Sequence, residues 1–395
     1  MSERRRFTSS SVMRGHPDKL CDRISDALVD AHLMTDQDAR IRAEAAAAGQ
    51  FVFVVTDARV HGEVDITGIV RATLAETRYR KVDLDPEHCA ILAQSSVMTP
   101  PWAVRPDSDV NPDDLPAQEQ TTVFGYACSE TPERMPLAIR LAHLTAGALD
   151  RLSLTQKLPG LGPDGSIQIT VEYDRDRPIR VDTVVLEAQF DGKAADLQEA
   201  VKQILSGPAL QAFSIAVDND TRLMINPEGP LLIGGPARNA GHTGRKQASD
   251  TYGGAARHGD GAMSGKDPMR LDRAAAYAAR HAATNIVAAG LATECELMLS
   301  YAVGEVQPTT VWARTFGRGD LSNERLSEII REVFDFRPGA IARRFRLWSL
   351  PREHAGRFYR ELAVGGQVGR TDMELPWEQL DAVPSLQVAS GALVG

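Results

Sequence analysis

Residues 15–33 read GHPDKLCDRISDALVDAHL, and this stretch decides how the chain begins to fold. Apolar side chains recur in it at helical spacing: Leu20, Ile24, Ala27, Leu28 and Ala31. The spacing predicts a helix over 17–34 with one buried face. Pro17 suits the first helical position, because its missing N–H would have had no partner there in any case.

The residues at the start of this helix are suited to binding an anion. A helix N-terminus presents free N–H groups and a partial positive charge, and His16 and Lys19 add two donors. Asp18 would repel a phosphate directly, but it suits a Mg²⁺ ion held between the protein and the phosphate. An ordinary helix start explains the same residues equally well, with Asp18 simply favoured by the helix dipole.

Strands and helices alternate irregularly along the rest of the chain. Alternating and β-branched patterns predict strands at 51–55, 89–93, 167–173, 181–188, 223–225, 231–233 and 296–303. Helical spacing predicts helices at 65–75, 196–205, 268–289 and 323–333. Because no regular strand–helix–strand ladder emerges, the pattern favours an α+β or irregular α/β fold. Residues 96–120 are rich in Asp and Pro without periodicity, which is typical of a lid or binding loop; a disordered insertion is the alternative.

Bulk composition excludes several classes of protein. The 395 residues are 43% hydrophobic and 25% charged with a net charge of -9, which gives no support to a nucleic-acid partner. No apolar run is long enough to span a membrane. The cysteines lie apart without a CxxC pair, which argues against a zinc site and for a reducing compartment. Because the N-terminus lacks the apolar region of a signal peptide, we expect a cytoplasmic protein.

Two glycine-rich segments carry clustered cations. Residues 241–254 read GHTGRKQASDTYGG, and their glycines allow a ligand to approach the backbone near Arg245 and Lys246. A solvated basic turn is the alternative. Residues 259–272 read GDGAMSGKDPMRLD, and the spacing around Lys266 fits neither a Walker A motif nor GxGxxG. A glycine-rich loop with a lysine before a helix still suits a phosphate.

Together these segments predict a site that balances the charge of ATP. The available cations are Lys19, Arg245, Lys246, Lys266 and Arg270. Asp18 and Asp272 supply carboxylates for Mg²⁺ between the protein and the triphosphate.

Several long motifs resemble those of the methionine adenosyltransferase (S-adenosylmethionine synthetase) family, and the similarity runs from about residue 7 to 381. They are GHPDKLCDRISDALVDAHL (15–33), FGYACSET (124–131), INPEGPLLIGGP (225–236), TGRKQASDTYGG (243–254), SGKDPMRLDRAAAYAAR (264–280) and FDFRPGAI (334–341). On these motifs the chain is identified as a divergent bacterial-type member.

The resemblance implies an α+β fold of three similar, interleaved subdomains. Its expected parts are an N-terminal unit (7–100), a lid loop (101–121), a central unit (122–232), a C-terminal unit (233–381) and a tail (382–395). It also implies homodimers, often paired into homotetramers, with active sites at the dimer interface.

The resemblance further implies a reaction and a set of site residues. The sulfur of L-methionine attacks C5′ of ATP, and the released triphosphate is cleaved to phosphate and pyrophosphate. The resemblance implies that two Mg²⁺ ions and a K⁺ ion assist this reaction. The expected catalytic residues are His16, Arg245, Lys246 and Lys266. The expected ATP contacts add Lys19, Asp164 and Ala262. The expected methionine pocket is Asp57, Gln94, Asn239 and Arg270. The expected metal ligands are Asp18 and Asp272 for Mg²⁺ and Glu44 for K⁺.

The sequence departs from the family motifs at several positions, which gather around the amino acid head of methionine and the lid. Family glutamates are replaced by Ser10, Arg14 and Asp57, an aspartate by Asn239, and a lysine by Arg270. The GAGDQG motif reads Ala117-Gln118-Glu119-Gln120-Thr121. These changes leave two alternatives beside the ordinary reaction: a specialised enzyme for a methionine analogue or altered nucleotide, and a weakly active regulatory subunit.

Overall fold

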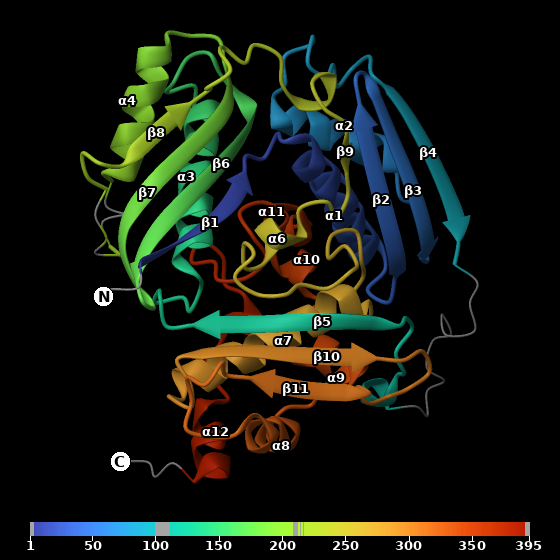
Figure 1. Cartoon of the computed structure of the whole chain (residues 1–395). Helices are drawn as coiled ribbons and strands as arrows, with labels where there is room; N and C mark the ends of the chain where they lie inside the picture. The colour runs from blue at the N-terminus through green and yellow to red at the C-terminus, as the bar shows by residue number, and fades with distance from the viewer. Residues whose placement is uncertain (1–3, 99–110, 208–211, 214, 216, 392–395) are drawn as a thin grey trace.

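The fold is built from three β-sheets with helices packed between and behind them (Figure 1). The computed structural model describes residues 4–98, 111–207, 212–213, 215 and 217–391. The predicted lid therefore lies outside the described residues as far as residue 110.

The first sheet has the strand order β1-β6-β7-β8, from β1 (Arg4–Val12), β6 (Leu161–Asp174), β7 (Arg177–Phe190) and β8 (Arg222–Ile225). Helix α3 (Leu137–Leu154) packs on β1 and β6, and α4 (Ala194–Leu205) packs on α3. Alternation in β6 buries Ile167, Ile169 and Val171 against α3 in a separate apolar core.

The second sheet has the order β4-β3-β2-β9, from β4 (Ala90–Val97), β3 (Phe51–Arg59), β2 (Arg40–Ala48) and β9 (Gly241–His242). Its inner face packs on α1 (Pro17–Thr35), and α2 (Ile66–Thr77) lies beside α1. Alternation in β3 buries Val52 and Val54 but leaves Phe51, Phe53 and Val55 exposed on the outer face.

The third sheet has the order β11-β10-β5, from β11 (Thr310–Arg314), β10 (Glu294–Tyr301) and β5 (Thr121–Cys128). Helix α7 (Leu271–Ala288) covers it so closely that a Cβ on Gly125 would lie 2.0 Å from the backbone of Ala279. Helix α8 (Asn323–Val333) packs on β11. Because no side chain larger than that of glycine fits at position 125, Gly125 sets how closely β5 approaches α7.

Short helices complete the fold. They are η2 (Pro112–Asp114), η3 (Gly235–Ala237), α6 (Gln247–Asp250), α9 (Pro338–Arg344), α10 (Leu350–Glu353), α11 (Phe358–Leu362), η4 (Pro376–Glu378) and α12 (Val383–Ser390). Helices α10 and α11 contact α1 between the sheets (Figure 1). Across the described part of the chain, no helix is both long and apolar enough to cross a membrane.

Every sheet contains strands that are distant in sequence, so the prediction of interleaved α+β units is confirmed. Strand β1 joins the sheet of the central region, and β9 joins the N-terminal sheet. The boundaries of the units stay a prediction.

Two sequence predictions were wrong in detail. Residues 231–233 were expected to form a strand, but Leu231 makes only an isolated bridge with Gln189. The helix expected from 268 begins at Leu271, because the Asp267 carboxylate accepts the Met269 N–H at 2.8 Å and holds a turn before it. Strands β1 and β2 were missed, since their Ser-rich and Ala-rich sequences have low strand propensity.

Candidate active site

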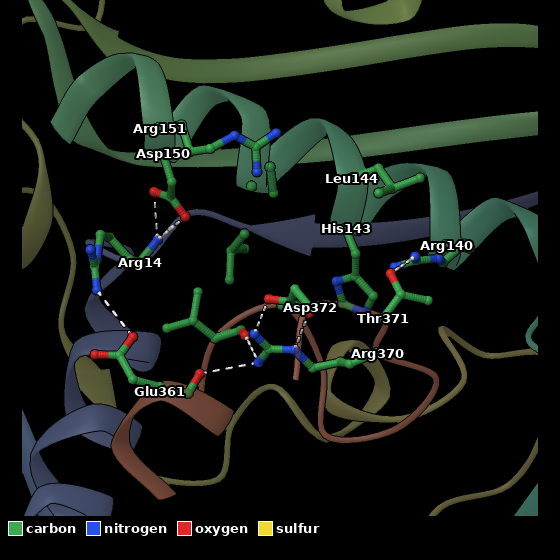
Figure 2. A pocket seen from close by; sticks show the side chains of 15 residues that line it. Arg14, Arg140, His143, Leu144, Asp150, Arg151, Glu361, Arg370, Thr371 and Asp372 are labelled. Carbon is green, nitrogen blue, oxygen red and sulfur yellow. Dashed lines mark hydrogen bonds and ion pairs between the residues drawn. The ribbon is translucent and has the colours of Figure 1, made fainter. Parts of the chain in front are cut away.

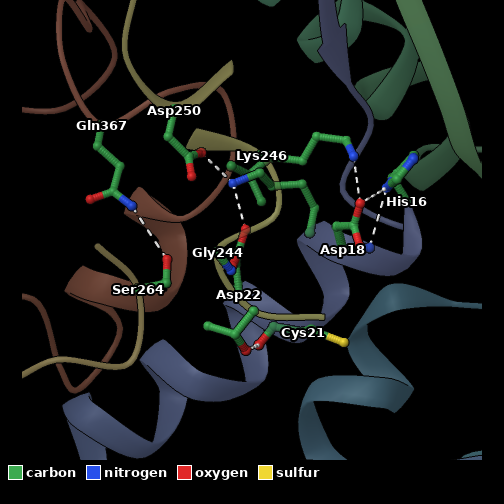
Figure 3. A network of polar contacts seen from close by, with 12 residues as sticks. His16, Asp18, Cys21, Asp22, Gly244, Lys246, Asp250, Ser264 and Gln367 are labelled. Atoms are coloured by element: carbon green, nitrogen blue, oxygen red, sulfur yellow. Dashed lines mark hydrogen bonds and ion pairs between the residues drawn. The ribbon is translucent and has the colours of Figure 1, made fainter. Parts of the chain in front are cut away.

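His16 caps the N-terminus of α1 with its side chain. Its backbone is extended (φ -61°, ψ 135°), and its Nδ1 accepts the Asp18 N–H at 3.2 Å (Figure 3). Burial, assisted by the charge of Lys246, lowers the pKa of His16 to about 4. The imidazole is therefore neutral at pH 7, and because Nδ1 is an acceptor, its proton lies on Nε2.

Asp18 gathers the cations of the 241–246 loop around it. Its carboxylate pairs with the ammonium of Lys246 (Figure 3). It also accepts the His242 N–H at 3.0 Å and lies 3.7 Å from the Arg245 guanidinium. Burial alone would raise the pKa of Asp18, but the hydrogen bond and charge of Lys246 outweigh it and hold this pKa below its usual value. Asp18 is therefore an anion with two cations beside it.

Close backbone packing brings this loop onto α1. A Cβ on Gly241 would lie 2.2 Å from the backbone of Pro17, so only glycine fits there. The Gly244 N–H donates to Asp22 at 2.8 Å. Strand β9 pairs with β2 and fixes the position from which Arg245 and Lys246 project.

Lys19 is turned away from these cations. Its ammonium is 2.8 Å from Asp22, also pairs with Asp250, and only 2% of its surface is exposed (Figure 3). The two carboxylates raise its pKa despite the opposing effect of burial. A contact between Lys19 and a phosphate stays a prediction, and its ion pairs favour a supporting role for the loop.

A second cluster forms where the 259–272 loop enters α7. The ammonium of Lys266 pairs with Asp272, and the hydroxyl of Thr121 donates to the same carboxylate at 2.5 Å. Glu119 accepts the Asp272 N–H at 3.3 Å and pairs with Arg270 at 3.2 Å. Asp272 and Lys266 are therefore held by the end of the lid segment.

The two clusters adjoin each other through glycines. A Cβ on Gly244 would lie 2.4 Å from the Cβ of Ala262, and one on Gly261 would lie 2.0 Å from the Asp272 carboxylate. Ala262 thus lies between the Arg245–Lys246 loop and Asp272.

Three further predicted residues share the outer face of the second sheet. In register, Glu44 lies opposite Val55, which lies opposite Gln94 on its other side, and Asp57 follows Val55 on the same face. Glu44 and Gln94 are exposed, and Ser96 donates to Asp57 at 3.3 Å. These residues form a separate group from the two cationic clusters.

Asp164 and Asn239 lie elsewhere. Asp164 is buried beside Gly234, accepts the Gly235 N–H at 2.7 Å, and burial raises its pKa to about 6. Asn239 is exposed after η3. The structure thus brings Arg245 and Lys246 close to Lys266. The methionine candidates are divided among three places: Asp57 and Gln94 on the second sheet, Arg270 beside the Lys266–Asp272 cluster, and Asn239 after η3.

Four residues that hold the site were missed from the sequence: Asp22, Asp250, Glu119 and Thr121. Asp22 lies three residues after Lys19 on α1, so an i,i+3 ion pair could have been predicted. No local signal marks the other three, because their partners are distant in sequence.

The carboxylates fit a metal that is bound together with a phosphate. Asp18 and Asp272 offer oxygen ligands, but each is already paired with a lysine. A triphosphate would take the lysines and free the carboxylates for a cation such as Mg²⁺, which usually shares its ligands with phosphates. Among the residues that the structure describes, the one close trio of metal-ligating side chains is the outlying Asp85, Glu87 and His88.

Three family models match the chain in succession. They are the N-terminal domain of S-adenosylmethionine synthetase over 4–99, its central domain over 114–231 and its C-terminal domain over 233–379. Relatives include the S-adenosylmethionine synthases of Thermosynechococcus vestitus (42% identical, 97% of each chain), Gloeobacter violaceus (42%, 97% of each) and Acaryochloris marina (41%, 100% of each).

Proposed function

The chain belongs to the S-adenosylmethionine synthetase family, and from this membership we propose its reaction and the roles of its residues. It is a metal-dependent methionine adenosyltransferase with ATP and methionine as substrates. The sulfur of L-methionine attacks C5′ of ATP and forms S-adenosylmethionine, and the triphosphate leaves and is cleaved to phosphate and pyrophosphate. The specialised and regulatory alternatives are less favoured, since the relatives cover the full chain.

The observation that carries this proposal is the joined pair of cationic clusters around Asp18 and Asp272. A thioether sulfur is already a nucleophile, so the reaction needs no general base. The main demand is to stabilise the negative charge that develops on the leaving triphosphate. Arg245, Lys246 and Lys266 would bind its oxygens.

His16 has the protonation state that this role requires. In its neutral imidazole, Nδ1 accepts the hydrogen bond from the Asp18 N–H. The Nε2–H is therefore left to donate toward the oxygen of the breaking C5′–O bond. A neutral donor there adds no charge to repel the neighbouring cations.

Asp18 and Asp272 are proposed as the ligands of Mg²⁺, in two ions shared with the phosphates, and Glu44 as the ligand of K⁺. Bound Mg²⁺ supplies positive charge to the triphosphate oxygens. Asp164 and Ala262 are assigned to the nucleotide.

A homodimer is proposed from the outer face of the second sheet. Large apolar side chains there are exposed, namely Phe51 (52%), Phe53 (44%), Val55 (52%) and Leu92 (56%). Such a face marks an interaction surface. Glu44, Asp57 and Gln94 lie on the same face, so a second copy seated on it would enclose them. A second copy of the chain is the favoured partner for this face, because the candidate methionine-binding residues lie in separate places within one chain. Pairing of dimers into tetramers is a further proposal.

We also place the enzyme in the cytoplasm, without a nucleic-acid or membrane partner. All four cysteines are free and buried, as in a reducing compartment, and the net charge is -9.

The reaction is tested with purified protein, ATP, methionine, Mg²⁺ and K⁺. The expected products are S-adenosylmethionine, detected by mass, with phosphate and pyrophosphate, and removal of divalent cations with EDTA should abolish them. Formation of ADP and phosphorylated methionine would contradict the proposal.

The double change Asn239→Asp with Asp57→Glu is expected to lower the KM for methionine. Restored carboxylates would hold the α-ammonium more strongly, by about 1–3 kcal/mol, the range of a charged hydrogen bond. Initial-rate kinetics measure the change, and the KM for ATP serves as the control. An unchanged KM for methionine would show that these two departures from the family do not affect substrate recognition.

A further inference from the structure

A cavity of about 250 Å³ lies between α3, the end of β1 and the segment that follows α11 (Figure 2). Its volume is that of roughly eight water molecules. None of the residues assigned to ATP, methionine or metal lines it. The cavity is therefore distinct from the proposed active site.

Arginines dominate the polar lining of the cavity: Arg14, Arg140, Arg151 and Arg370 (Figure 2). Arg140 pairs with Glu133 at 3.0 Å and Arg370 with Asp372 at 2.6 Å, so these two are neutralised. Arg14 is less tightly held, because among the described residues its guanidinium pairs with one carboxylate, that of Glu361, at 4.0 Å.

Arg151 stands at the exposed rim. Within the part of the chain that the structure describes, no hydrogen bond or ion pair engages its guanidinium. Arg14 and Arg151 therefore supply the positive charge that the cavity leaves available.

Two buried side-chain nitrogens at the cavity lack partners. The Nε of Arg14 and the Nε2 of His143 are buried and have no hydrogen bond in the described structure. His143 is only 6% exposed, and its Nδ1 is 2.8 Å from the Ser11 hydroxyl; in the tautomer in which that hydroxyl donates to Nδ1, the ring proton lies on Nε2. Burial, assisted by the charges of Arg140 and Arg370, lowers the pKa of His143 to about 3, so its imidazole is neutral. An unmet buried donor is costly, which favours a ligand that accepts its hydrogen bond.

The acids of the lining do not cancel this positive charge. Glu361 forms an ion pair with Arg357 at 2.8 Å, and Asp372 forms an ion pair with Arg370. Asp150 accepts the backbone N–H of Arg14 at 3.1 Å, and burial raises its pKa to about 7, so it is only partly charged at neutral pH.

We propose that this cavity binds a small anion with a carboxylate or phosphate group, held by the guanidinium groups of Arg14 and Arg151 and by the Nε2 of His143. Guanidinium groups bind both kinds of anion with paired, charge-assisted hydrogen bonds.

Isothermal titration of the full chain at pH 7 and low salt tests the proposal. Succinate is the probe in one arm and inorganic phosphate in the other, which distinguishes a carboxylate from a phosphate ligand. The expected result is saturable binding of at least one probe. Arg151→Gln and Arg14→Gln should each weaken it about tenfold or more, the effect of one lost charged hydrogen bond.

Arg222→Gln is the matched control, because Arg222 is also exposed but lies on β8, away from the cavity. Arg151→Gln keeps the test decisive if Arg14→Gln fails to fold. Absence of saturable binding for both probes, or equal affinity in both cavity variants, would overturn the proposal.

Phosphate is also a product of the proposed reaction, so its arm is repeated with Lys266→Ala. Retained binding is expected there, since Lys266 does not line the cavity. Binding lost in Lys266→Ala but kept in Arg151→Gln would place phosphate in the ATP site and overturn the phosphate arm. The assay for S-adenosylmethionine is independent of either result.

Discussion

Lys266→Ala is expected to lower kcat about 10²–10³-fold, the cost of losing one preorganised group that stabilises developing charge. Lys266 pairs with Asp272 between the 259–272 loop and α7, beside the Asp18 cluster. Its ammonium is therefore placed to bind the triphosphate as it leaves. Arg245→Ala should lower kcat by a similar factor, because Arg245 approaches the same site from the opposite loop.

Steady-state formation of S-adenosylmethionine measures the effect, and circular dichroism checks the fold. Lys202→Ala is the matched control, because Lys202 is an exposed lysine on α4, remote from the site. Near-normal turnover in both Lys266→Ala and Arg245→Ala would mean that the phosphates bind elsewhere.

Phe53→Glu is expected to dissociate the dimer and to remove activity with it. The change places a charge in the middle of the exposed apolar face of β3. We expect the dimer dissociation constant to rise about 10²–10³-fold, the scale of a lost aromatic hot spot. If the methionine pocket needs a second copy, activity should fall with the dimer fraction and return at high protein concentration.

Light scattering and activity, both measured over a range of concentrations, test this prediction. Val388→Glu is the control, because Val388 is also an exposed apolar residue (74%) but lies on α12. An active Phe53→Glu monomer would refute a shared active site.

The sequence indicates the parts of the candidate site that depend on local chemistry, and their roles stay a prediction. The cap of α1, Arg245 and Lys246, and Lys266 before a helix each leave a recognisable pattern over a few residues. Their structural supports were not predictable in this way. Glu119 and Thr121 reach Asp272 from about 150 residues away, and Asp250 reaches Lys19 from further still.

Strand β2 was not predicted for the same reason. The Ala-rich β2 is a strand because α1 packs on one side and β3 and β9 pair with its edges, and none of these contacts is local. In such a segment, tertiary contacts override intrinsic propensity.

The pairing of β9 with β2 has a consequence for how the chain folds during synthesis. Until residues 241–250 leave the ribosome, β2 has an unpaired edge, and Lys19 lacks its buried partner Asp250. A strand edge of this kind is a site for misassociation. Because these contacts are so distant in sequence, closing them should be slow. The N-terminal half should therefore remain incompletely folded until residues 241–250 pair with β2 and Lys19.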